Sequence, residues 1–252
     1  MHNLKLKTLR CLNYLFVNFY RLLTPPLLLS CARYLRLRLK TYHGQWKIDK
    51  KIAEYLNYDN GYYVELGAVD GIGLSNTLHF ELHRNWSGLL IEPAPNNYLK
   101  CLANRGKKNV VVCNACTSFE YKDKFVEMIY AHYMSTPVGL ESDVIDPDAH
   151  AQSGSKLLAT AAEKVYRFGA IAKPLNTLLL EANAPNKIDF LSLDVEGAEI
   201  DVLKGIDHER FRFKLMCIES RDKDKITEYL SQHGYHYAEQ ISPLDHIYLA
   251  ND

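Results

Sequence analysis

Three acidic residues and a glycine follow the apolar run 190–193. They are Asp194, Glu196, Gly197 and Glu199. An unpaired carboxylate is costly to bury, so we expect a buried strand that ends at Asp194 and places this acid at the rim of the core. In open α/β sheets, ligands bind in the crevice outside the carboxyl ends of the strands. The segment is therefore a candidate for ligand binding or proton transfer.

A second acidic strand end lies in the segment 62–71, which reads Tyr-Tyr-Val-Glu-Leu-Gly-Ala-Val-Asp-Gly. A nicotinamide fingerprint, G-x-G-x-x-G, needs a second glycine, but Val69 stands in its place. The carboxylates of Glu65 and Asp70 would repel a diphosphate. They suit a cofactor that carries an amino group and a sulfonium, which indicates S-adenosylmethionine.

Glu92 ends the next predicted strand, 87–92, and extends this pattern. An acid at that point in a dinucleotide-type fold accepts hydrogen bonds from ribose hydroxyls, and its two oxygens can serve both hydroxyls. The alternative interpretation makes Glu65 and Glu92 ordinary strand-end acids on a solvated rim.

The elements between these acids alternate, with Pro and Gly at many boundaries. The predicted strands are 62–66, 87–92, 110–114, 188–194 and 215–219, followed by a hairpin of 235–241 and 246–250. The predicted helices are 48–57, 75–84, 95–105, 175–183, 198–204 and 222–233. This order predicts an α/β fold with a mostly parallel sheet and helices on both faces.

Residues 131–170 are rich in Ser, Gly, Pro and Ala and interrupt this alternation. Long insertions of this kind often form lids or substrate loops, and an extra strand is predicted just before it, at 125–130. We assign residues 46–252 to one catalytic domain with this insertion at about 131–170.

Residues 1–45 form a separate basic and apolar segment, with no acid before Asp49. Arg21 and the Pro25–Pro26 pair interrupt the apolar run, and neither half reaches the ~20 residues of a membrane-spanning helix. One interpretation is an interfacial anchor that binds anionic lipids at the cytoplasmic face of the inner membrane through residues 1–40. The other is a helical cap that packs on the domain.

The overall composition is that of an ordinary soluble globular protein, and the cysteine pattern fits a reducing compartment such as the cytoplasm. The formal net charge is zero, so we expect no nucleic-acid partner. Cys113 and Cys116 have the spacing of a metal or redox pair, but no second pair accompanies them, so we predict reduced thiols and no metal site there.

Several of these segments resemble the FkbM family of S-adenosylmethionine-dependent methyltransferases. The matching pieces are 64–71 with Ser75–Thr77, then 90–95, and 188–205 with its Asp-x-Glu-Gly-x-Glu element. The resemblance spans roughly 60–240 and implies a Rossmann-like seven-stranded methyltransferase sheet. It also implies methyl transfer to a hydroxyl, commonly on a sugar of a glycan or glycolipid. Members often end the fifth strand with a Glu-His-Asn-like sequence, whereas this chain has Glu219-Ser220-Arg221.

The candidate catalytic base is Asp194, with Glu196 second and His132, in the insertion, third. Asn114, at the end of the third strand, is a candidate for the adenine edge or a turn residue. The predicted cofactor-binding residues are Glu65, Gly67, Ala68, Asp70, Gly71, Glu92, Pro93, Asn114 and Asp194.

Alternatives stay open at this point. Asp194 could serve only to bind cofactor or to hold the turn at Gly197, and a divalent ion on Asp194 and Glu219 could acidify the acceptor. The competing functions are a nicotinamide-dependent oxidoreductase and a catalytically silent, membrane-tethered scaffold of the same fold.

Overall fold

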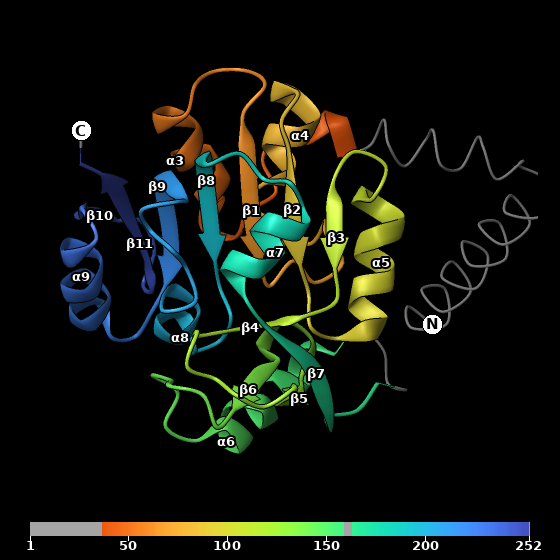
Figure 1. Ribbon diagram of the computed structural model, residues 1–252. Helices are drawn as coiled ribbons and strands as arrows, with labels where there is room; N and C mark the ends of the chain where they lie inside the picture. Colours follow the sequence, from red (N-terminus) through yellow and green to blue (C-terminus); the bar gives the residue numbers. More distant parts are fainter. Residues whose placement is uncertain (1–36, 159–162, 252) are drawn as a thin grey trace, which may run out of the picture. The chain divides into compact units, whose positions relative to one another are not determined.

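A seven-stranded sheet forms the centre of the fold, in the order β10-β11-β9-β8-β1-β2-β3 (Figure 1). The computed structural model describes residues 37–158 and 163–251. The chain divides into two units, 1–41 and 42–252. The account below concerns the second unit. The anchor or cap predicted for residues 1–40 lies almost wholly outside the described residues.

The sheet has the strand directions predicted from the sequence. Strands β1, β2, β3, β8 and β9 pair in parallel, and β11 is antiparallel to both β9 and β10. The mostly parallel sheet with an antiparallel C-terminal hairpin is thereby confirmed. The strands are β1 (Tyr62–Leu66), β2 (Ser87–Ile91), β3 (Val110–Val112), β8 (Lys187–Leu193), β9 (Arg212–Glu219), β10 (Tyr235–Gln240) and β11 (Asp245–Ala250).

Helices cover both faces of this sheet. Because side chains alternate along a strand, Val64 and Leu66 of β1 pack in one core cluster with α7, α8 and α9. Tyr63 packs in the other with α3, α4 and α5. The helices are α3 (Ile48–Tyr55), α4 (Leu78–Arg84), α5 (Pro95–Arg105), α7 (Leu175–Glu181), α8 (Glu199–Leu203) and α9 (Lys223–Gln232).

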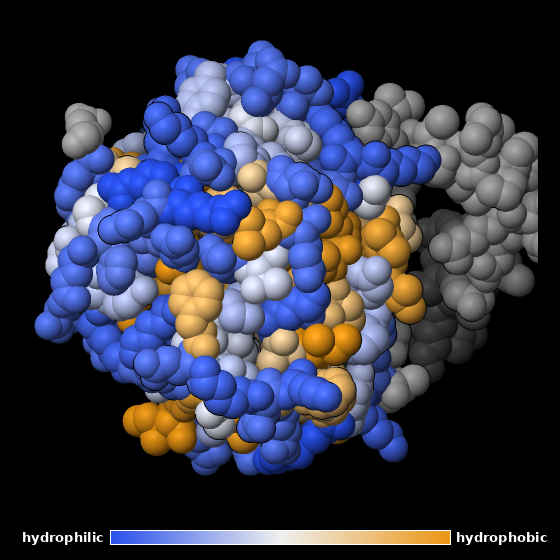
Figure 2. Space-filling model, in the orientation of Figure 1, coloured by the Kyte–Doolittle hydropathy of each residue, from blue (hydrophilic) through white to orange (hydrophobic). Residues whose placement is uncertain are grey.

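The outer sides of these elements are mainly polar. Most of the face drawn in Figure 2 is hydrophilic, with apolar side chains gathered in limited patches. This is the pattern of helices that bury one apolar side against a sheet. Among the described residues, no helix has both the length and the apolar character needed to cross a membrane.

Residues 115–174 build a second, four-stranded sheet in the order β4-β7-β5-β6. In Figure 1 it lies below the carboxyl ends of the main strands. The sequence predicted one of its strands, 125–130, and treated 131–170 as irregular. The second sheet comprises β4 (Ala115–Thr117), β5 (Phe125–Tyr130), β6 (Thr136–Val138) and β7 (Tyr166–Pro174), with η2 (His132–Met134), α6 (Pro147–Gly154) and η3 (Ser155–Leu157) between them.

The topology fixes where a ligand can enter. The chain runs from β1 outward through β2 to β3, and later from β8, on the other side of β1, outward to β9. The crevice at the carboxyl ends of β1 and β8 is therefore a topological switch point, the usual place for a ligand in such sheets.

Candidate functional site

A cavity of about 490 Å³ lies at this switch point, between the main strand ends and the second sheet. That volume is within the range of small-molecule sites. Nine of the eleven predicted site residues line it, and Asp70 and Gly71 do not. The nine are Glu65, Gly67, Ala68, Glu92, Pro93, Asn114, His132, Asp194 and Glu196.

The carboxylate of Glu65 is buried and engaged by the loop that follows β1. It accepts hydrogen bonds from Ser75 Oγ at 3.0 Å, from the Asn76 amide at 2.9 Å and from Thr77 Oγ1 at 2.6 Å. Arg105 Nη1 lies 3.8 Å away. Glu65 therefore shapes the cavity wall by holding this loop in place.

Asp70 and Gly71 shape the same loop from outside the cavity lining. Asp70 Oδ1 accepts hydrogen bonds from the Ile72 and Gly73 amides at 2.9 and 2.8 Å. Gly71 has a positive φ of 75°, and a Cβ there would lie 2.7 Å from Cγ of Arg105. From the sequence alone, an acid that stabilises this turn, as Asp70 does, cannot be distinguished from one that faces a ligand, because both can stand at the same position after the strand.

Glu92 links the residues that follow β1 and β2 through hydrogen bonds. Its Oε2 accepts a hydrogen bond from the Val69 amide and its Oε1 one from the Ala94 amide, both at 2.9 Å. Burial raises the pKa of Glu92 to about 7, although these hydrogen bonds lower it. Each carboxylate oxygen has a further lone pair, so Glu92 can also accept hydrogen bonds from a diol in the cavity.

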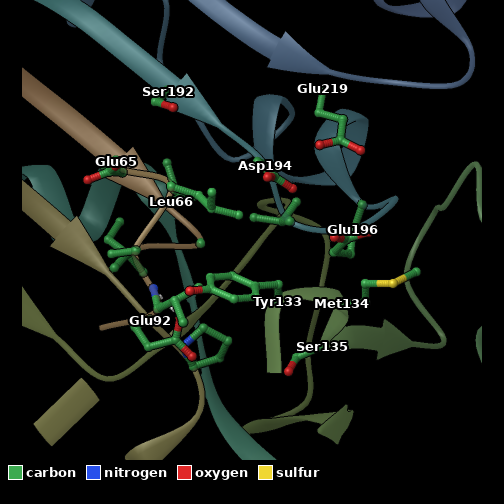
Figure 3. A pocket seen from close by; sticks show the side chains of 18 of the residues that line it. Glu65, Leu66, Glu92, Tyr133, Met134, Ser135, Ser192, Asp194, Glu196 and Glu219 are labelled. Atoms are coloured by element: carbon green, nitrogen blue, oxygen red, sulfur yellow. Dashed lines mark hydrogen bonds between the residues drawn. The ribbon is translucent and has the colours of Figure 1, made fainter. Parts of the chain in front are cut away.

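Asp194, Glu196 and Glu219 converge on one point of the cavity (Figure 3). One carboxylate oxygen of each lies within 4.8 Å of the others. The Oδ1 atom of Asp194 is closed to solvent and has no hydrogen-bond partner in the described part of the chain. Burial, and then the charges of Glu219 and Glu196, raise the pKa of Asp194 well above its usual range.

Two basic residues that sequence analysis did not select border this acidic group. Arg221 Nη2 lies 3.6 Å from Glu196 and 4.0 Å from Glu219, and His150 Nε2 lies 2.7 Å from Glu196 Oε2. Burial, Glu196 and Asp245 raise the pKa of Glu219 to about 7, while Arg221 lowers it. His150 comes from the insertion, where no pattern indicated it, whereas Arg221 stands in the segment that departs from the family's sequence.

His132 also reaches the cavity, from η2 in the second sheet. It has a positive φ of 59°, and its ring contacts Tyr133 edge-on, with centroids 4.2 Å apart. Burial lowers its pKa. In Figure 3 the Tyr133 ring lies between Glu92 and the acidic group. Tyr133 therefore lies between the part of the cavity at Glu92 and the part at the acidic group.

A sequence profile of the methyltransferase FkbM domain matches residues 65–237, more than half of the chain. No curated protein sequence matches significantly.

Three solved structures are similar in backbone arrangement. The N-terminal domain of human METTL16 in complex with SAH is 11% identical, with 81% of this chain and 66% of that chain covered and a TM-score of 0.41. A candidate RNA methyltransferase from Pyrococcus horikoshii is 10% identical, with 82% of this chain and 81% of that chain covered and a TM-score of 0.39. Precorrin-6y C5,15-methyltransferase from Geobacter metallireducens is 13% identical, with 77% of this chain and 82% of that chain covered and a TM-score of 0.36.

Proposed function

Because the chain belongs to the FkbM family of methyltransferases, we propose that it transfers the methyl group of its cofactor, S-adenosylmethionine, to a hydroxyl oxygen of a sugar in a glycan or glycolipid. The family match decides between a methyltransferase and a nicotinamide-dependent oxidoreductase in favour of the former.

The cofactor occupies the half of the cavity at β1, β2 and β3. Glu92 would accept hydrogen bonds from the two ribose hydroxyls, and Asn114 would lie near the adenine. The loop held by Glu65 contacts the methionine portion, whose amino group is attracted to the acidic lining. All of these residues line one cavity, in which the cofactor would present its methyl group to the acceptor.

The acceptor occupies the other half, at the ends of β8 and β9. Its hydroxyl donates a hydrogen bond to Asp194, which takes the proton as the oxygen attacks the methyl carbon. The carbon–sulfur bond breaks, and its electron pair returns to sulfur to give S-adenosylhomocysteine. Alignment of the three reacting atoms supplies much of the acceleration, and a base whose pKa is raised toward the working pH is effective.

The unpaired, buried Oδ1 of Asp194 is the observation that carries this proposal. A buried acceptor atom without a donor is unfavourable, and a substrate hydroxyl supplies the donor. The neighbouring carboxylates of Glu196 and Glu219 can accept hydrogen bonds from further hydroxyls, which a sugar offers. The same charges repel phosphate groups, which argues against a nucleic-acid acceptor.

Methyl transfer from tritiated S-adenosylmethionine tests the acceptor class. The full-length protein is incubated separately with cell-envelope glycolipid, neutral polysaccharide, total RNA and protein fractions. We expect label in a carbohydrate fraction, present as an alkali-stable O-methyl group on a sugar after hydrolysis. Label confined to RNA or protein would contradict the proposal.

A further inference from the structure

Six carboxylates gather around the ends of β8 and β9, and most of them have hydrogen-bond donors. Glu199 Oε1 accepts from the Val195 and Gly197 amides at 3.0 and 3.1 Å. Asp143 accepts from Ser220 Oγ and the Arg221 amide, and Asp245 accepts from Ser242 Oγ. These three acids are used to hold turns.

The remaining three, Asp194, Glu196 and Glu219, face the cavity together. Arg221 contacts Glu196 and Glu219. Arg221 also pairs with Asp143, so its one positive charge only partly offsets these three acids. A cation bound between them would offset more of that negative charge.

We propose that Asp194, Glu196 and Glu219 bind one divalent cation of the Mg²⁺ or Mn²⁺ class. Their oxygens lie within 4.8 Å of one another, whereas oxygen ligands of such an ion are about 3 Å apart when adjacent and about 4.2 Å apart when opposite. The three carboxylate side chains must therefore move closer together to close the site. Hard oxygen ligands of this kind suit these ions better than zinc.

A second observation points to a ligand at this place. The Oδ1 atom of Asp194 is closed to solvent and has no partner among the described residues, and Figure 3 shows the Asp194 side chain near those of Glu196 and Glu219. A structural acid cluster would satisfy such an atom with a backbone or side-chain donor, as Glu199 is satisfied. The alternative is a proton shared between Asp194 and Glu219.

The ion deepens the proposed function, on which this catalytic role rests. An acceptor hydroxyl that coordinates the ion loses its proton more readily, because a bound cation lowers the pKa of its oxygen ligands. With the ion bound to Oδ1, Asp194 takes the acceptor proton through Oδ2; without the ion, Oδ1 accepts the hydrogen bond of the hydroxyl directly. The oxygen then attacks the methyl carbon, and the carbon–sulfur bond breaks as before.

Titration of the EDTA-stripped full-length protein with Mn²⁺ tests the site without any acceptor. Free Mn²⁺ is followed by electron paramagnetic resonance, with and without S-adenosylhomocysteine. We expect one bound Mn²⁺ per chain, displaced by Mg²⁺, and a loss of affinity of about tenfold or more in Glu219→Gln. Glu127→Gln is the matched control, since Glu127 is half-exposed and pairs with Arg167 on the second sheet. It should bind Mn²⁺ like the wild type.

A second variant separates lost ligation from lost folding. Asp194→Asn should bind Mn²⁺ weakly but melt at a higher temperature than the wild type in EDTA, because it removes one of three repelling charges. Absence of Mn²⁺ binding, or unchanged binding in Glu219→Gln, would overturn the site. Undiminished methyl transfer in EDTA would overturn its catalytic role, whereas failure to methylate sugars with Mn²⁺ still bound would count only against the proposed acceptor.

Discussion

Gly67 lies directly against the backbone carbonyl of Asp194, so that a Cβ at Gly67 would be 2.1 Å from that oxygen. The turn that follows β1 and the residue that follows β8 are therefore in contact at the switch point. Gly67 also has a positive φ of 75°, which other residues adopt at a cost. The contact fixes the proposed cofactor loop relative to the proposed base.

Replacement of Gly67 by alanine should break this relationship. The clash is with backbone, so the loop must move away from Asp194, and we expect at least a tenfold loss of S-adenosylhomocysteine affinity in calorimetry. Gly139→Ala is the matched control: Gly139 has φ of 81°, but a Cβ there has no atom within 4 Å among the residues described. Gly139→Ala should lower the free energy of unfolding only through backbone strain, by about 1 kcal/mol, and should leave S-adenosylhomocysteine affinity unchanged. Equal effects of the two substitutions would refute the contact argument.

The affinity for S-adenosylhomocysteine should rise between pH 6 and pH 8. The pKa of Glu92 is about 7 in the free protein, and ribose hydroxyls donate to its ionised form. Below pH 7 a proton must therefore leave before the ligand binds, which weakens binding by up to about tenfold per pH unit. Glu92→Gln should bind more weakly at pH 8 and show a flatter pH dependence. A wild-type affinity that is constant over this range would rule out this role for Glu92.

Arg105 should be a stability determinant of the cofactor loop. It is buried at 2% exposure, donates to the Gly71 carbonyl at 2.7 Å and to Thr77 Oγ1 at 3.1 Å, and pairs with Glu81. Arg105→Met leaves buried charges unpaired and should lower the unfolding free energy by about 3–5 kcal/mol. We would measure this by urea denaturation.

Arg84→Met is the control for that measurement, because Arg84 forms a partly exposed ion pair with Asp59 at 3.5 Å. Such pairs contribute about 1 kcal/mol or less. A comparable loss in both variants would show that the buried network around Arg105 has no special role.

The basic segment 1–40 should bind anionic membranes. Its eight Lys and Arg residues and absence of acids predict binding to phosphatidylserine vesicles that weakens as salt is raised. Protein lacking residues 1–40 should remain in the supernatant in a sedimentation assay. Sedimentation that is unchanged by the deletion would instead favour the helical cap.

The main sheet could be predicted because its strands carry local signals. Val64 and Leu66 alternate with polar residues toward one core, and the ends of β1, β2 and β8 are followed by Gly67, Glu92 and Asp194. The start of α4 also has a local reason: the sequence predicts a helix from residue 75, whereas α4 begins at Leu78, whose amide donates to Ser75 Oγ at 3.1 Å.

The rest of the site depends on contacts that no local pattern encodes. His150 forms a hydrogen bond with Glu196 only because the second sheet lies next to the carboxyl ends of the main strands. Arg105 was predicted as an ordinary helix end, but burial beside Glu65 and Glu81 gives it its role. Two strands of the second sheet, β4 and β6, are only three residues long, too short for their periodicity to be recognised.

The central claim is that Asp194 takes the acceptor proton, and the Asp194→Asn variant tests it most directly. Its affinity for S-adenosylhomocysteine and its rate of methyl transfer to the wild-type acceptor should be measured on the same preparation. We predict affinity within about threefold of the wild type and a rate lower by about 10²–10⁴-fold. Methyl transfer near the wild-type rate, with cofactor affinity intact, would contradict the claim.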